Sequence, residues 1–174
     1  MNKFKFLIAL SLMWVFQIQT YAQKFALVDV NQVLENLDDY KKAQTELDRV
    51  AAEWKQEIAV EYDKIKALYN KYQAEQVLLT EEQRKLKEEE IMNKEKEARK
   101  IQKDKFGEDG ELFKKRQDLV RPIQDKVYAA IQDYALARTL DAIFDTSGSA
   151  GIIYYNKELD KTEDIIKKLK GLAK

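Results

Sequence analysis

The chain has 174 residues, of which 36% are charged and 45% are apolar, and its 31 basic residues balance its 31 acidic ones. It contains no cysteine and no histidine, which excludes disulfides, thiol nucleophiles, imidazole bases and zinc sites built on these residues. The zero net charge argues against a dedicated nucleic-acid binder, because affinity for phosphates needs a basic surplus. The composition therefore favours binding or scaffolding over catalysis.

The first 22 residues have the pattern of a secretory signal peptide. Lys3 and Lys5 precede an apolar run over residues 6–16, and a polar stretch then leads to Ala22, a small residue of the kind that precedes cleavage sites. The run is about eleven residues, shorter than the roughly twenty that span a bilayer. An uncleaved N-terminal anchor helix is the alternative, because Thr20 is an imperfect match to the cleavage pattern. We expect cleavage after Ala22 and no transmembrane segment in the remaining chain.

Residues 23–39 are expected to hold a strand and a short helix. The strand-like segment covers residues 25–30. Asn31 belongs to the residue types that cap helices, and it precedes apolar residues at helical spacing. We therefore expect a helix that begins after Asn31.

Residues 40–120 are rich in charges of both signs, lack proline, and have glycine only at positions 107 and 110. Such a segment is either a long solvated helical structure or disordered. Periodicity favours helix, because apolar residues in the first half recur every three or four positions and so line one face. The second half has a thinner stripe and gains support from Glu to Lys or Arg pairs four residues apart. The first stripe comprises Tyr40, Ala43, Leu47, Ala51, Trp54, Ile58, Tyr62, Ile65, Tyr69 and Tyr72.

The chain must reverse direction within this segment, and two positions can provide the turn. Residues 106–110 have the stronger turn composition, whereas Thr80 with Gln83 can form a capping box at a helix start. A turn at Thr80 gives two arms of equal length, roughly 60 Å each, while a turn at 107–110 leaves much of one helix unpaired. We predict a helical hairpin arm over residues 40–120 with its tip near Thr80, in which Gly107 and Gly110 are flexible points.

The remaining residues are expected to complete a small body. Pro122 falls where the second arm returns to the level of the first, and there it should bend a helix that then continues. Residues 142–145 and 152–155 flank a Gly and Ser-rich turn, which predicts a β-hairpin. Asp160, with Glu163 three residues later, predicts the start of a C-terminal helix that ends near Gly171.

Residues 23–39 and 121–174 together predict a β-containing oligomerisation body. Two or three short strands are marginal on their own, and a body of this size buries little core without partners. Apolar side chains from the expected strands should therefore be covered by other copies of the chain. These side chains are Phe25, Leu27, Ile143, Phe144, Ile152 and Tyr154.

In this order of elements the sequence resembles the Skp/OmpH family of periplasmic chaperones. The resemblance extends over the whole mature chain and depends on order and spacing, since no single motif is specific. The segments that carry it are Phe25-Ala26-Leu27-Val28-Asp29-Val30-Asn31, Arg121-Pro122-Ile123, residues 140–145, Tyr154-Tyr155-Asn156 and residues 159–165.

The resemblance implies an α+β fold, mostly α, with a small β body and a long antiparallel helical hairpin arm in each chain. It further implies a homotrimer whose body is a β-barrel built from strands of all three subunits. Three arms would enclose unfolded outer-membrane β-barrel proteins in the periplasm without ATP. Well-known members are strongly basic, whereas this chain is not, so no lipopolysaccharide site is carried over.

Candidate client-binding residues lie near the predicted tip. Val77, Leu78 and Leu79 are consecutive and cannot all face one partner helix, so part of this group should be exposed and available for contact. Tyr69 and Tyr72 are further candidates, although helical spacing also fits the seam between the two arms. The run of glutamates at 88–90 is interpreted as a solvated face and not as a cation site.

No catalytic residue, metal site or cofactor is expected. Carboxylate pairs such as Asp38-Asp39 have neither an apolar pocket nor a partner nucleophile. The alternative to a holdase chaperone is a structural coiled-coil spacer or adaptor of the cell envelope. A spacer would share the arms and the signal peptide but would not need the terminal β unit.

Overall fold

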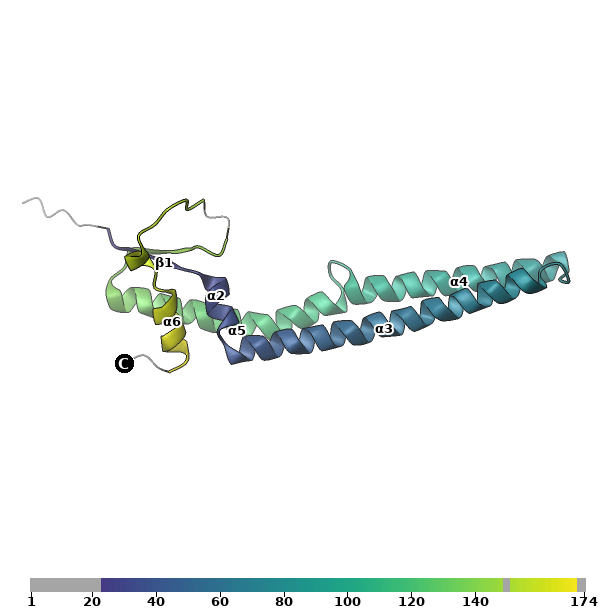
Figure 1. The fold of residues 1–174 in the computed structure, drawn as a ribbon, viewed down its shortest axis with the longest axis horizontal. Coiled ribbons are helices and arrows are strands. Elements are labelled where there is room, and N and C mark those ends of the chain that lie inside the picture. The colour runs from purple at the N-terminus through teal and green to yellow at the C-terminus, as the bar shows by residue number, and fades with distance from the viewer. Residues whose placement is uncertain (1–22, 149–150, 172–174) are drawn as a thin grey trace, which may run out of the picture.

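The computed structural model describes residues 23–148 and 151–171, so the expected signal peptide lies outside the described residues. The chain is mostly helical, with one two-stranded sheet at the end of a long helical arm (Figure 1). None of the helices in the described residues combines the length and apolarity needed to cross a membrane. In chain order the elements are β1 (Phe25–Val28), α2 (Val30–Glu35), α3 (Asp38–Glu75), α4 (Glu81–Phe106), α5 (Glu111–Arg138), β2 (Ala142–Asp145), the 3-10 turn η1 (Lys157–Leu159) and α6 (Thr162–Leu169).

The arm is an antiparallel hairpin in which α3 packs first against α5, near the body, and then against α4 (Figure 1). Contacts across it join Tyr62 to Gln102 and Tyr72 to Glu88, close to the pairing expected for a turn near Thr80. The arm buries few side chains because each helix offers only a narrow apolar stripe. Its buried residues are Ala43, Leu47, Val50, Ile58 and Ile65 on α3, Ile91 and Ala98 on α4, and Val120 on α5.

The capping box predicted at the start of α4 is confirmed. Gln83 N donates to Thr80 Oγ1 at 3.3 Å, and Thr80 N donates to Gln83 Oε1 at 3.0 Å. These two bonds satisfy amide groups that a helix start otherwise leaves unpaired. Glu81 and Glu82 in the first turn add a favourable interaction with the helix dipole.

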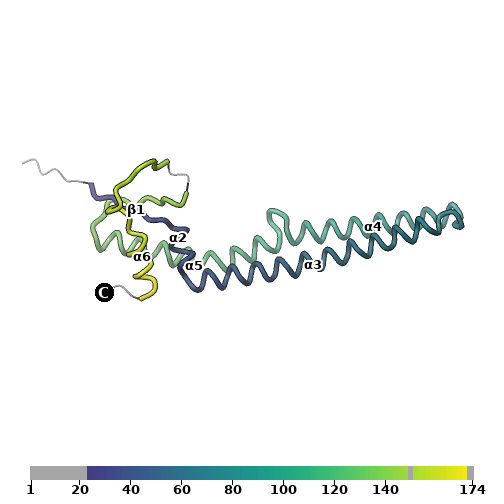
Figure 2. The backbone as a smooth tube through the Cα atoms, viewed as in Figure 1, coloured from purple at the N-terminus to yellow at the C-terminus, as the bar shows by residue number. Residues whose placement is uncertain are grey.

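The returning arm is not one continuous helix, which corrects the expectation for residues 81–120. Figure 2 shows the backbone leaving the line of the arm between α4 and α5 and then rejoining it. Gly107 and Gly110 bound this loop, and a Cβ added to Gly107 would lie 2.5 Å from Lys103 O. A Cβ at Gly110 would lie 2.9 Å from Gly107 N, Gly107 O and Lys105 O. The glycines are therefore required for close backbone approach, which is a different role from that of free hinges.

Helix α5 continues through Pro122 into the body without an interruption. There it packs against α2 and α6 around the main core. Val33, Val127 and Ile165 are fully buried at its centre. The complete set of buried residues in this core is Val28, Val30, Val33, Leu34, Leu37, Val127, Tyr134, Ile165 and Ile166.

The sheet differs from the predicted β-hairpin. β2 pairs in parallel with β1, so that Phe25 lies opposite Ala142 and Val28 opposite Asp145. Residues 151–156 form no strand. Burial of apolar surface accounts for the difference. Pairing with β1 places β2 beside the buried side chains of that strand, whereas Ile153 and Tyr154 are exposed and would add little buried surface to a local hairpin.

Two predicted helix starts are also displaced. The short helix α2 begins at Val30, and its cap is Asp29, whose Oδ1 accepts from Gln32 N at 2.8 Å. The predicted cap, Asn31, lies inside the helix. The last helix, α6, has Lys161 at its cap position, where the sequence predicted Asp160. Asp160 still contacts the helix start, because its Oδ1 accepts from Thr162 N at 3.0 Å. Gly171 follows α6 with a φ of 68°, the left-handed conformation typical of helix ends.

The expectation that all six body residues need a partner chain for burial is wrong in part. Leu27 is buried by its own chain, and Ile143 packs against the main core. The remaining four keep some exposure: Ile152 is half-buried and Phe25, Phe144 and Tyr154 are exposed. The chain covers more of its small body than its length suggested because α5 extends across it.

Candidate functional site

The turn between α3 and α4 lies at the far end of the arm (Figure 1). It presents apolar side chains to solvent. Val77 is 77% exposed and Leu78 is 83% exposed, while Leu79 is half-buried. Exposed apolar side chains are common singly, but two adjacent ones on a short turn form a small contact surface. We call Val77, Leu78 and Leu79 the tip.

Backbone and side-chain hydrogen bonds fix the tip. Leu78 N donates to Glu75 O at 2.9 Å, and Gln76 N donates to Tyr72 O at 2.8 Å, which continues the α3 pattern into the turn. On the other side, Arg84 Nε donates to Gln76 O at 2.8 Å. Together with the Thr80 capping box, these bonds hold the turn from both helices.

The two tyrosine candidates lie in different surroundings. Tyr72 packs against the buried cluster of Ile65, Ile91 and Ala98, and its hydroxyl donates to Glu88 Oε1 at 2.5 Å. That hydrogen bond, with burial and the carboxylate charge, raises the pKa of Tyr72. Tyr69 is about half exposed, and its hydroxyl accepts from Gln73 Nε2 at 2.8 Å. Tyr72 is thus part of the seam between the helices, and Tyr69 lies on the surface.

The body carries a second exposed apolar region. Phe25 on β1 and Phe144 on β2 lie diagonally across the sheet, since Phe144 pairs with Leu27, two residues from Phe25. Their ring centroids are 5.8 Å apart, and both are partly exposed. Ile153 is fully exposed and Tyr154 is 87% exposed, in a segment without regular structure. Sequence reasoning named Tyr154 but missed Ile153, although both are apolar residues of the same short run.

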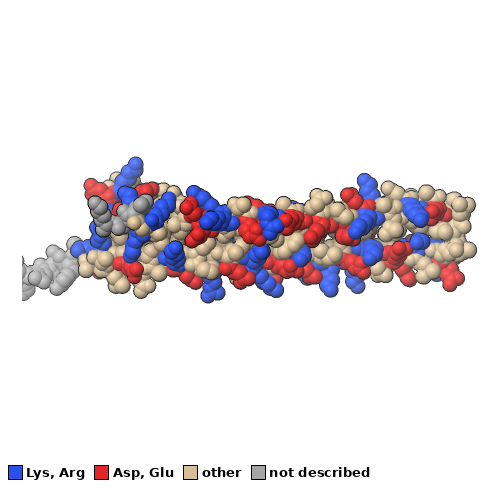
Figure 3. Space-filling model, turned by 90° about the horizontal axis from the view of Figure 1, so that it is seen from below, with Lys and Arg blue, Asp and Glu red and all other residues tan. Residues whose placement is uncertain are grey.

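Charges of both signs are interspersed along the arm. Figure 3 shows lysine, arginine and carboxylate side chains mixed over the visible face, without a large area of one sign. Many of them pair along a helix, as Lys87 does with Glu90 at 2.9 Å and Arg99 with Glu95 at 3.2 Å. Exposed pairs of this kind contribute little stability, and the face seen in Figure 3 offers no single-sign field to attract a partner.

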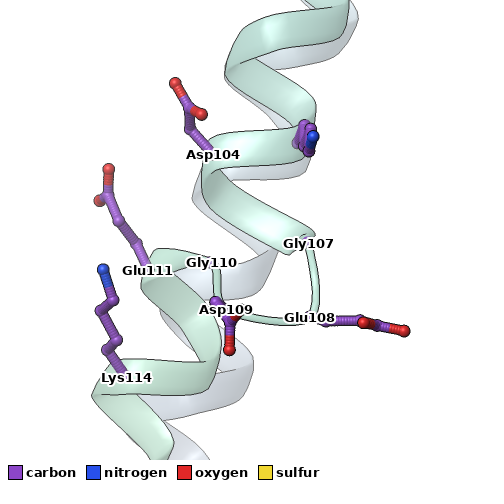
Figure 4. A pocket seen from close by; sticks show the side chains of 8 residues that line it. Asp104, Gly107, Glu108, Asp109, Gly110, Glu111 and Lys114 are labelled. Carbon is purple, nitrogen blue, oxygen red and sulfur yellow. The ribbon is translucent and has the colours of Figure 1, made fainter.

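A surface hollow lies beside the loop between α4 and α5, and it does not have the features of an active site. The labelled side chains around it point in different directions, with Glu108 directed away from the loop (Figure 4). Its lining is mostly charged side chains that face solvent. In residues 23–148 and 151–171 no group of three histidine, cysteine or acidic side chains is placed to hold a metal ion. The tip and the body surface are therefore the stronger candidates.

Fold and surface together define a class of protein: a small α+β body with a long helical hairpin arm that exposes apolar side chains at its end. The model of the family described as "Outer membrane protein (OmpH-like)" matches residues 24–169. The chain belongs to this OmpH-like family. The resemblance inferred from the order of elements is thereby confirmed.

Two further proteins are similar to this chain in sequence or in fold. The chain is 29% identical over 150 residues to an uncharacterized protein of Aquifex aeolicus (strain VF5). The alignment covers 86% of this chain and 88% of that protein. A crystal structure of a candidate OmpH-like outer membrane chaperone from Caulobacter crescentus CB15 superposes with a TM-score of 0.70 at 10% identity, over 88% of each chain. At that identity the match establishes the shared fold. The expected fold class, mostly helical with a small sheet and long helices, is confirmed.

Proposed function

We propose that this protein is an ATP-independent holdase chaperone that binds unfolded outer-membrane β-barrel proteins in the periplasm and prevents their aggregation. Membership of the OmpH-like family supports a chaperone-type function. The observation that carries the proposal is the exposure of Val77 and Leu78 at the end of a long arm. An apolar surface on a projecting arm can reach a non-native chain, and weak apolar contacts allow its later release.

The proposal includes a homotrimeric body. Phe25, Phe144, Ile153 and Tyr154 expose apolar surface next to a sheet of only two strands, and such a sheet is marginal alone. Strands from other copies would cover these side chains and add to the sheet. With three arms around one client, several weak contacts would act together and raise the overall affinity.

The decisive experiment measures aggregation of an outer-membrane β-barrel protein diluted from urea, with and without the purified mature protein. The wild type should keep the client in solution at stoichiometric amounts. Because charges are mixed along the arm, this effect should weaken only modestly between low and physiological salt. A wild type that does not suppress aggregation would overturn the proposal in favour of a structural spacer of the envelope.

A matched pair of variants tests the tip. Replacing Val77, Leu78 and Leu79 together by serine should impair client retention and leave the oligomer intact. The control replaces three exposed apolar residues elsewhere on the arm by serine, namely Val60, Met92 and Ile101. Equal client retention by the two variants would remove the tip from the mechanism.

Light scattering and intact-mass analysis test the remaining parts. We expect a trimeric mass at micromolar concentration, and a monomeric mass would contradict the assembly. Phe144→Asp should dissociate the oligomer, because an unpaired charge in an apolar interface costs several kcal/mol. Mass analysis of envelope material should give a chain that begins at Gln23, and retention of Met1 would contradict the predicted export signal.

A further inference from the structure

The contact between Arg84 and the main chain of Gln76, just before the tip, is not explained by the needs of its own helix. Arg84 is the fourth residue of α4. The first turns of a helix carry partial positive charge, so a cation there is unfavourable to α4 itself. Its guanidinium instead donates to the main-chain oxygen of Gln76. Gln76 directly follows Glu75, the last residue of α3.

That position suits a cation at the end of α3. The last carbonyl groups of a helix lack partners within the helix, and the dipole places partial negative charge there. A hydrogen bond from a charged donor is stronger than one between neutral groups. The side chain is half-buried at this point, which reduces competition from water. Arg84 therefore links the two helices immediately before Val77 and Leu78.

We propose that Arg84 is a positioning residue for the tip, which holds Val77 and Leu78 in a fixed outward orientation for contact with unfolded β-barrel clients. This inference rests on the proposed function. A surface of two or three apolar side chains gains little free energy on binding, so an entropic cost of ordering the turn would strongly weaken client binding. A turn that is already ordered avoids that cost. Arg84 would thus raise client affinity without contributing apolar surface.

The test compares Arg84→Gln with Lys85→Gln. Both variants remove one positive charge at neighbouring positions of α4, and Lys85 is exposed. Arg84→Lys is the conservative variant, which keeps the charge but replaces the planar guanidinium by a single ammonium. Two readouts are needed: the ¹⁵N relaxation and amide exchange of Val77 and Leu78, and the chaperone concentration for half-maximal suppression of client aggregation.

Arg84→Gln should increase the mobility of Val77 and Leu78 and speed exchange of the Leu78 amide. It should also raise the half-maximal concentration roughly threefold to tenfold, the range expected for one hydrogen bond. Arg84→Lys should fall between this variant and the wild type, and Lys85→Gln should match the wild type. The thermal unfolding midpoint of the body should not change, because Arg84 is in the first turn of α4, and α4 begins at the end of the arm away from the body (Figure 1).

The outcomes separate this inference from the proposed function. An unchanged tip in Arg84→Gln overturns the positioning role, and so does a mobile tip with unchanged client retention. Either result would leave the holdase intact if the serine variant of Val77, Leu78 and Leu79 still lost activity. A wild type without holdase activity would instead overturn the proposed function, and the positioning role for clients with it.

Discussion

The hydroxyl of Tyr134 donates a hydrogen bond to Asp164 Oδ2 at 2.7 Å and so joins α5 to α6 in the body. Burial, followed by this hydrogen bond, raises the pKa of Tyr134 to about 12 from an ordinary value of 10.0. The guanidinium of Arg138 lies over the same ring, 5.1 Å from its centroid. A packed aromatic ring and a polar contact therefore depend on one side chain that must stay protonated.

The first prediction concerns alkaline stability. Because the pKa of Tyr134 is higher in the folded chain than in the unfolded one, its contribution is fully present below about pH 10 and is lost as the pH rises through about 12. The urea midpoint of the wild type should therefore fall more steeply over this interval than that of Tyr134→Phe. Tyr128→Phe, at an exposed position on the same helix, should keep the wild-type profile. Parallel profiles for the wild type and Tyr134→Phe would contradict the assignment.

The second prediction concerns the loop between α4 and α5. Gly107→Ala should destabilise the protein by about 1–3 kcal/mol, the usual cost of forcing an atom into occupied space, because the added Cβ would meet Lys103 O. Gly148→Ala is the control, since nothing in the described chain beyond its own neighbours in sequence lies within 4 Å of a Cβ at that position. Urea unfolding followed by circular dichroism measures both. If Gly107→Ala is as stable as the control, the loop can rearrange, and the steric account is wrong.

The third prediction concerns the contacts around Trp54 that close the same loop. Lys105 Nζ lies 4.4 Å from the Trp54 ring centroid and 2.6 Å from Glu111 Oε2, and Phe106 packs edge-on to the ring. Lys105→Met and Glu111→Gln should each lower the free energy of unfolding by about 0.5–1 kcal/mol.

A double-mutant cycle checks whether these contacts act together. The double variant should lose less than the sum of the two single losses, because Lys105 and Glu111 share one ion pair. Lys103→Met, a nearby exposed lysine, should have little effect. Strictly additive losses would show that the two residues act independently.

The fourth prediction concerns Thr162, the one buried polar residue of the described chain. Its Oγ1 accepts from Asp29 N at 2.9 Å and donates to Asp160 Oδ1 at 2.6 Å. Thr162→Val keeps the shape but leaves the Asp29 amide without its partner, which should cost about 1–3 kcal/mol. Thr162→Ser keeps the hydroxyl and should retain more of the stability. A valine variant more stable than the serine variant would mean that packing outweighs the hydrogen bonds.

Local signals in the sequence were sufficient for the arm. The capping box of Thr80 and Gln83 depends on four consecutive residues, and the equal lengths of the two arms follow from helix geometry. Exposure of the tip was also predictable, because three consecutive apolar residues cannot all face one partner. The role of Arg84 could not be predicted, because it depends on a hydrogen bond to the end of another helix.

The long-range pairing of β1 with β2 could not be predicted from local sequence patterns. Residues 142–145 and 152–155 have the pattern of a hairpin, but the pairing of β2 with β1 depends on burial of Ala26 and Val28 in a core that α5 and α6 complete. The loop between α4 and α5 could not be predicted either. Two glycines near the middle of a helix suggest flexibility, and only the backbone contacts show that they are sterically required.

The parallel pairing of β1 with β2 also has a consequence for the order of folding. The chain segments joined at this sheet are far apart in sequence, as the separation of 117 positions from Lys24 to Asp141 shows. The first strand can therefore pair only after the whole of the intervening arm has been synthesised. Formation of the helical hairpin brings both ends of the arm together, which shortens the loop that the sheet must close. The arm is thus expected to fold first and to guide assembly of the body.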